Sequence, residues 1–203
     1  MFKKTTFAAA FATLFIAAGA AHSASNVIGS VQTDARINSA SQTQSGLLNK
    51  QEANFASVSD SNVIGSVETH ARINRADQRQ SGLLNKQELN AGSVKDSNVI
   101  GSVETHSTIN RVSQRQSGLL NKQEFNAGSV KGSNVIGSVE THARVNSATQ
   151  TQSGLLNKQK ANIASVEGSN VIGSVNAHAT VNRMSQSQSG LLNSQKLSAG
   201  SVD

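Results

Sequence analysis

The chain has 203 residues, of which 36% are hydrophobic and 15% charged, and its formal net charge is +6. It contains no Cys, Pro, Trp or Tyr, which excludes disulfides, thiol catalysis and thiolate metal sites. Without proline, every backbone N–H can join a β-ladder. The composition is too polar for an ordinary globular core, and its aliphatic positions recur too regularly for a featureless disordered chain.

The first 23 residues or so predict a secretory signal peptide. Lys3 and Lys4 form a basic start, and an apolar stretch follows from Ala8 to Ala21. This stretch is short for a membrane span, so we expect cleavage after Ser23 rather than a retained membrane anchor.

The rest of the chain is a tandem repeat of 36 residues. The block Ser-Asn-Val-Ile-Gly-Ser-Val and the block Gln-Ser-Gly-Leu-Leu-Asn each occur five times at this spacing. The repeats are residues 25–60, 61–96, 97–132, 133–168 and 169–203. Periods of 20–50 residues are typical of stacked architectures.

The second repeat predicts strands and bends. From Val63 to Ile73, small or apolar residues alternate with polar or charged ones, which indicates a strand with one inward face. The phase reverses between Ile73 and Asn74, which predicts a bend there and puts Asn74 on the inward face. A turn is expected at Ser81-Gly82 and its equivalents. The turn glycines are Gly46, Gly82, Gly118, Gly154 and Gly190.

Beyond that turn, a second strand is expected. Asn85, Gln87, Leu89 and Ala91 would face inward, and Lys86, Glu88 and Asn90 outward. Lys95 to Asn98 would close the repeat with turn-forming residues.

The positions of Leu89 and Ala91 vary together. In every repeat one member of the pair is large and the other is Ala: Ala53/Phe55, Leu89/Ala91, Phe125/Ala127, Ala161/Ile163 and Leu197/Ala199. Constant total volume is what a shared, close-packed core requires. The pattern therefore predicts that the repeats stack in register.

Five amide columns are identical in all five repeats. Buried primary amides are costly unless paired, and identical layers stacked about 4.8 Å apart would bond each amide to its own copy. We therefore expect ladders in five columns: Asn38, Asn74, Asn110, Asn146 and Asn182; Gln42, Gln78, Gln114, Gln150 and Gln186; Gln44, Gln80, Gln116, Gln152 and Gln188; Asn49, Asn85, Asn121, Asn157 and Asn193; Gln51, Gln87, Gln123, Gln159 and Gln195. Exposed loop amides are the alternative interpretation.

The predicted fold class is all-β, a β-solenoid or cross-β stack of five repeats. A layer could be the whole 36-residue repeat or two windings of about 18 residues. No proline, insertion or distinct capping segment protects the first or last repeat, so we expect end-to-end addition of further molecules into amyloid fibrils.

The segment Asn38-x5-Gln44-x-Gly46-x-x-Asn49-x-Gln51 resembles the curlin repeat of curli, a secreted bacterial functional amyloid. It departs from that repeat with Asn for the first Ser and Gln for the final Ala. The repeat length and the Asn/Gln-rich strands are more similar to the Fap fibril subunit of pseudomonads. The resemblance implies a biofilm matrix fibre, exported through the periplasm and an outer-membrane channel to the cell surface and seeded by a nucleator subunit.

Other chemistry finds little support. His70, His106, His142 and His178 share one position and could bind a transition metal, but solvated surface residues fit better. If stacked, they would disfavour protonation and slow assembly below about pH 6. No combination of nucleophile, base and acid occurs that is not simply repeated in every unit. No glycine pattern matches a phosphate-binding loop. We expect no enzyme activity, cofactor, metal, nucleic-acid partner or membrane insertion of the mature chain.

The sequence therefore predicts a self-assembling structural subunit of an extracellular fibre for adhesion or biofilm. The first alternative is a soluble, monomeric β-solenoid adhesin or ice-binding protein, for which the one Thr column (Thr33, Thr69, Thr105, Thr141) is meagre support. The second is a disordered, low-complexity secreted chain.

Overall fold

The computed structural model describes residues 12–18, 22–23 and 26–203, and every described element is a β-strand. Each complete layer holds a three-residue strand, a long strand, a medium strand and a two-residue strand. The strands are β1 Ala12–Ala18 and β2 His22–Ser23; β3 Asn26–Ile28, β4 Val31–Leu47, β5 Asn49–Phe55 and β6 Val58–Ser59; β7 Asn62–Ile64, β8 Val67–Leu83, β9 Lys86–Ala91 and β10 Val94–Lys95; β11 Asn98–Ile100, β12 Val103–Leu119, β13 Lys122–Ala127 and β14 Val130–Lys131; β15 Asn134–Ile136, β16 Val139–Leu155, β17 Lys158–Ile163 and β18 Val166–Glu167; β19 Asn170–Ile172, β20 Val175–Val181, β21 Met184–Ser189 and β22 Ser194–Ala199.

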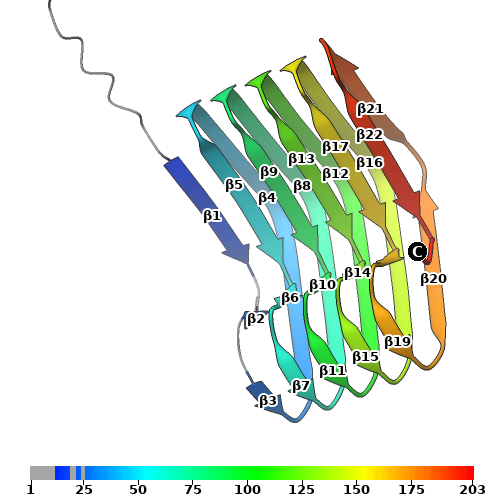
Figure 1. Cartoon of the computed structure of the whole chain (residues 1–203). Coiled ribbons are helices and arrows are strands. Elements are labelled where there is room, and N and C mark those ends of the chain that lie inside the picture. Colours follow the sequence, from blue (N-terminus) through cyan, green and yellow to red (C-terminus); the bar gives the residue numbers. More distant parts are fainter. Residues whose placement is uncertain (1–11, 19–21, 24–25) are drawn as a thin grey trace, which may run out of the picture.

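Strands of the same kind stack into four parallel sheets along one axis (Figure 1). Pairing joins each residue to its equivalent one repeat away, as in Val67↔Val103 and Gln78↔Gln114. The layer is therefore one whole repeat of 36 residues, and the alternative of two shorter windings is wrong. The expected β-solenoid is confirmed.

Two apolar cores run along the stack. Three valines per layer fill the lobe between the short strands and the start of the long strand; Val63, Val67 and Val94 are each about 1% exposed or less. The second core lies between the long and medium strands and contains the paired large and small residues, with Phe55, Leu89 and Phe125 fully buried. Constant volume at these positions lets successive layers pack without voids.

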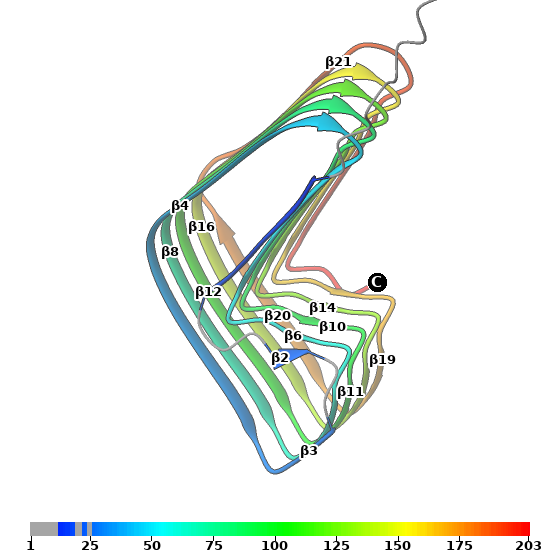
Figure 2. The same ribbon diagram turned by 90° about the vertical axis from the view of Figure 1, so that its left-hand side faces the viewer.

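The long strand bends near Asn74, and the bend divides the molecule in Figure 2 into a lower lobe and an upper arm. Ile73 is buried, whereas Asn74 and Arg75 are both exposed, before burial resumes at Ala76. The phase change therefore falls one residue later than predicted, and Asn74 faces outward. In the last repeat the strand is interrupted here, between β20 and β21.

The turn between the long and medium strands lies at Leu84, not at Ser81-Gly82 as predicted. The strand runs on to Leu83, and Leu84 takes a left-handed φ of 54°. Gly82 is required for another reason, because a Cβ there would lie 1.7 Å from the carbonyl oxygen of Gly46 in the adjacent layer. Asn85 then closes the turn by donating from Nδ2 to the Gly82 carbonyl at 2.8 Å.

Part of the predicted signal peptide lies beside the first repeat. β1 pairs in parallel with β5, from Ala12↔Asn49 to Ala18↔Phe55, and β2 pairs with β6. The rest of the predicted leader, residues 1–11 and 19–21, lies outside the described residues, as do the first two residues after the expected cleavage point. Residues 12–18 and 22–23 therefore cover the edges of β5 and β6 at this end of the stack.

Candidate assembly interface and amide ladders

Four of the five predicted amide columns form hydrogen-bonded ladders inside the stack. In the column of Gln78, each Nε2 donates to the Oε1 one layer earlier at 2.7–2.8 Å. The column of Gln80 spans 2.7–3.1 Å, and that of Gln87 2.9–3.1 Å. The amides in the first four repeats of these columns are buried, and those of the last repeat are half-buried or exposed at the end of the stack.

The fourth ladder, the column of Asn85, runs in the opposite direction. Asn49, Asn85, Asn121 and Asn157 each donate to the Oδ1 of the next layer at 3.0 Å. Its first member, Asn49, is 2% exposed where β1 pairs with β5, and its Oδ1 has no donor. A buried acceptor without a partner is costly, and a donor from a preceding layer would satisfy it.

The fifth column also forms a ladder, but on the surface. Asn38, Asn74, Asn110, Asn146 and Asn182 are linked at 2.8–3.1 Å, and all are exposed. Placing Asn74 inward is therefore wrong. The same Asn occurs at this position in all five repeats because it forms the ladder at the bend, not because it is buried.

Sequence reasoning missed a further internal ladder. Asn90, assigned to the outward face, donates to Asn54 at 2.7 Å and accepts from Asn126 at 2.7 Å; Asn90 is only 6% exposed. The signal was present, since Asn recurs at this position in four repeats and gives way to Ser198 only in the last. An outer column of Asn26, Asn62, Asn98 and Asn134 at the closing turn is linked in the same way.

Glu88 was also assigned to the outward face, and the structure buries it. The chain folds back after Ala91, so that Lys95 of β10 covers this side of β9. Glu88 pairs with Lys86 at 2.9 Å and Lys95 at 3.2 Å, and its side chain is 3% exposed. Burial by itself would raise the pKa of Glu88, but the hydrogen bond from Lys86 and the charges of Lys95 and Lys86 lower it to about 2.

Glu124 repeats this arrangement with Lys122 and Lys131. Burial again opposes ionisation, and the hydrogen bond and charge of Lys131 nevertheless lower the pKa of Glu124. Each of these two glutamates therefore lies between two lysines and forms an ion pair with both.

The histidines form a stacked row on the long strand. Ring centroids of His70, His106, His142 and His178 are 5.0, 5.0 and 5.3 Å apart. Each of the first three has a glutamate carboxylate 3.4–3.7 Å from Nδ1, from Glu68, Glu104 and Glu140. Each of these glutamates therefore lies beside the histidine two residues later on the same strand.

Aliphatic side chains also form exposed rows. Ile64, Ile100 and Ile136 are 53–54% exposed on one corner, and a pair of leucine rows lies at the Leu84 turn. Continuous exposed apolar surface is characteristic of association sites.

Both ends of the stack present open strand edges. At the last repeat, β19, β20, β21 and β22 are terminal in their sheets, and at the first repeat β3 and β4 are terminal. Such edges can template the pairing of another chain.

No family model, curated protein or solved structure matches this chain. Within the residues that the structure describes, no group of three or more His, Asp or Glu side chains is arranged to hold a metal ion. The same residues include no helix that is long and apolar enough to cross a membrane.

Proposed function

We propose that this protein is the structural subunit of an extracellular functional-amyloid fibre that grows end to end by stacking of whole molecules. The observation that carries the proposal is the unfinished ladder of the Asn85 column, whose first member lies on the β5 edge that removal of the predicted leader would open. Asn49 Oδ1 lacks a donor at one end, while Asn193 at the other end donates only to Gly190 O and has a second N–H to give.

A second molecule placed one layer beyond the last repeat would satisfy these groups. Continuing the observed register pairs β20 and β21 with the incoming β4, and β22 with the incoming β5. Asn193 then meets the incoming Asn49, and Gln186 meets Gln42. Each completed amide bond contributes roughly 1 kcal/mol net, in addition to the backbone ladders. By resemblance to curli and Fap, the setting would be a biofilm matrix, with a nucleator and an outer-membrane export channel as partners.

A soluble monomeric solenoid adhesin or ice-binding protein is the second candidate. The exposed isoleucine and leucine rows and the open edges favour association over a monomer. Thr33, Thr69, Thr105 and Thr141 are at most 1% exposed, so this column is not on the surface where ice would bind.

Incubating residues 24–203 at neutral pH and sedimenting the product separates these functions. We expect pelleted fibrils whose diffraction shows a meridional spacing of about 4.8 Å. A chain that stays in the supernatant as a monomer for days at high concentration refutes the fibre and supports the adhesin. The uncleaved chain is the comparison, and we expect its assembly to be slower because β1 covers the β5 edge.

A further inference from the structure

The structure separates the two kinds of basic residue. All eight arginines lie along the long strand, or at its interruption in the last repeat: Arg36, Arg72, Arg75, Arg79, Arg111, Arg115, Arg144 and Arg183. Among the arginines, all of which lie in the described part of the chain, only Arg75 forms an ion pair, with Asp77 at 2.7 Å. The sequence alone shows only a diffuse basic excess, because the arginines are far apart along the chain. Stacking of the layers brings them close together in space.

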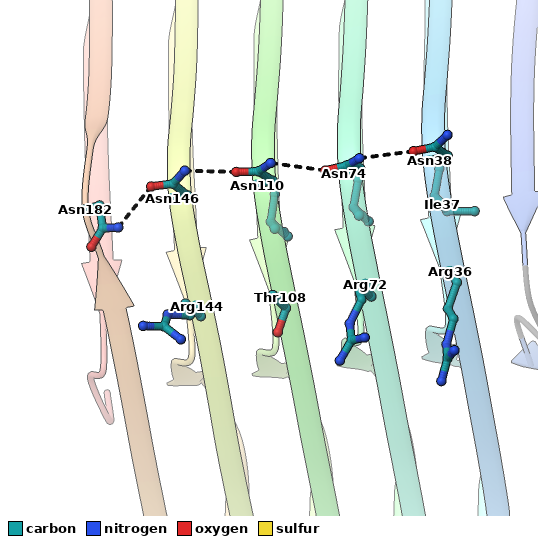
Figure 3. A pocket seen from close by; sticks show the side chains of 12 residues that line it. Arg36, Ile37, Asn38, Arg72, Asn74, Thr108, Asn110, Arg144, Asn146 and Asn182 are labelled. Carbon is teal, nitrogen blue, oxygen red and sulfur yellow. Dashed lines mark hydrogen bonds between the residues drawn. The ribbon is translucent and has the colours of Figure 1, made fainter.

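Three of these arginines border a groove that runs along the stack axis at the bend (Figure 3). Arg36, Arg72 and Arg144 occupy one rim, with Thr108 in the row between Arg72 and Arg144. The opposite rim is the exposed Asn ladder from Asn38 to Asn182, and Ile37, Ile73 and Ile109 lie between the rims.

The groove offers two kinds of donor to a ligand. The guanidinium groups are planar donors that can bind a carboxylate through two parallel hydrogen bonds. Asn74, Asn110, Asn146 and Asn182 each donate one N–H to the preceding layer, which leaves the second N–H for a ligand oxygen such as a hydroxyl. Carboxylates along one side and hydroxyls along the other are the chemistry of an acidic polysaccharide.

We propose that this groove binds an extended acidic polysaccharide carrying carboxylate groups, with the sugar chain parallel to the stack axis. Layers recur about every 4.8 Å, a spacing comparable to the length of one sugar ring in an extended chain. Nucleic acid fits less well. The phosphates of a duplex wind away from a straight row, and a single strand requires aromatic stacking residues, which are absent from this groove.

The inference goes beyond the proposed function and does not depend on it, because one molecule already contains the groove. A fluorescently labelled oligogalacturonate long enough to span the five repeats would be titrated with freshly filtered monomer and, separately, with pelleted fibrils. We expect binding that weakens as salt is raised, as for a ligand held by ion pairing. Binding to monomer with no fibrils would retain this inference and refute the fibre.

The decisive variant is Arg36→Gln/Arg72→Gln/Arg144→Gln. We expect its affinity to fall by about tenfold or more, because it loses the three cations of one rim. The matched control is Lys86→Gln/Lys122→Gln/Lys158→Gln, which removes the same charge elsewhere while Glu88 and Glu124 keep Lys95 and Lys131. Equal losses in both variants would show general charge attraction and overturn the proposal.

Competition and chemical protection complete the test. A neutral cello-oligosaccharide of equal length should not displace the labelled oligogalacturonate. Equal displacement by the neutral sugar, or tighter binding of a DNA duplex to the same arginines, overturns the proposal.

If the arginine variant fails to fold, phenylglyoxal modification of the arginines in the wild-type protein takes the place of that variant. Bound oligogalacturonate should protect Arg36, Arg72 and Arg144 and leave Arg183 reactive, whereas no protection refutes the site.

Discussion

At the scale of single residues, burial of an amide in this fold depends on the layers above and below it. Gln123 is fully buried, donates to Gln87 at 3.0 Å and accepts from Gln159 at 3.1 Å. Its partners cannot turn to water, so the ladder stabilises only if every layer supplies the same group.

Gln123→Leu tests this dependence. The change should lower the free energy of unfolding by roughly 2 kcal/mol or more, because it leaves the Oε1 of Gln87 and the Nε2 of Gln159 without their ladder partner. Urea denaturation of the monomer measures it, and the lag time of fibril formation should lengthen in parallel. Lys158→Ala, at an exposed position, is the control, and equal effects of the two changes would contradict the internal placement.

The acid sensitivity of Glu88 is a second residue-level prediction. Because the pKa of Glu88 is about 2 in the folded protein and ordinarily 4.5, its stabilising contribution is complete above about pH 4.5 and is lost as the pH falls towards 2. The difference corresponds to about 3 kcal/mol. Unfolding free energies measured from pH 5 to pH 2 should therefore fall less steeply in Glu88→Gln than in the wild type.

Glu104→Gln is the control for this pH series, since that carboxylate is half-exposed and lies beside His106. A wild-type slope that Glu88→Gln leaves unchanged would show that the buried ion pairs do not set the acid stability. Glu124, whose pKa is also lowered, should respond in the same direction when replaced.

At the scale of strands and rows, the histidine stack combines repulsion and attraction. Protonated rings 5.0 Å apart repel, but carboxylates 3.4–3.7 Å from three of them oppose that repulsion. The acid slowing expected from the sequence should therefore be pronounced only when the carboxylates are removed.

We predict that Glu68→Gln/Glu104→Gln/Glu140→Gln assembles several-fold more slowly at pH 5.5 than at pH 7.5, the range in which histidine charges. The wild type should change much less over that range. Seeded elongation rates give the comparison, and His→Asn at all four positions in the triple variant should restore pH independence. Equal pH profiles of the triple variant and the wild type would refute the coupling.

The strand-end glycines show what the turn requires. Gly118 takes a φ of 124°, and a Cβ there would lie 1.7 Å from the Gly82 carbonyl oxygen. Gly168 also has a positive φ, 54°, but a Cβ there would meet nothing within 4 Å. Ala56 and Ala164 adopt left-handed angles of 47° and 45°, close to that of Gly168 but far from the 124° of Gly118. The two glycines therefore differ both in backbone conformation and in the space around them.

Gly118→Ala should therefore cost more than about 3 kcal/mol or force two layers apart, whereas Gly168→Ala should cost only about 1 kcal/mol. Thermal and urea unfolding of both variants compare these costs. A similar small effect of both substitutions would show that the layers are not in close contact at this position.

Sequence periodicity predicted the buried and exposed faces well from Val67 to Ile73. The single strand that it predicted from Val63 to Ile73 is wrong, because the chain turns at Gly65 and Ser66 and divides this segment between β7 and β8, which belong to different sheets. It failed at Glu88 and Asn90, because alternation assigns a face without showing that Lys95 and the fold-back cover it. It also failed at Asn74, because an exposed ladder and a buried one both keep the same residue in every repeat. The row of arginines that includes Arg72 was not predicted either, because its members become neighbours only when one repeat stacks on the next.

At the scale of the whole molecule, the fold is modular in units of one layer. Since every strand pairs with its equivalent one repeat away, any repeat can lie on any other with the same hydrogen bonds. A repeat protein of this kind has a stability that is approximately a sum over layers and their interfaces.

Deletion of residues 97–132 therefore provides a direct test. Removing this whole layer brings β8 against β16 with Val67 opposite Val139, and both cores and all five amide columns continue. Elongation from seeds of the full chain should proceed within about twofold of the wild-type rate, while the monomer loses the stability of one layer.

Deletion of residues 97–114 is the control. It removes only half a layer and places Asp96 before Arg115, so valines face amides and the register is lost. That variant should neither fold into a β-stack by circular dichroism nor extend the seeds. If the two deletions behaved alike, stacking of equivalent residues could not be what builds the molecule, and the end-to-end growth inferred from it would fail as well.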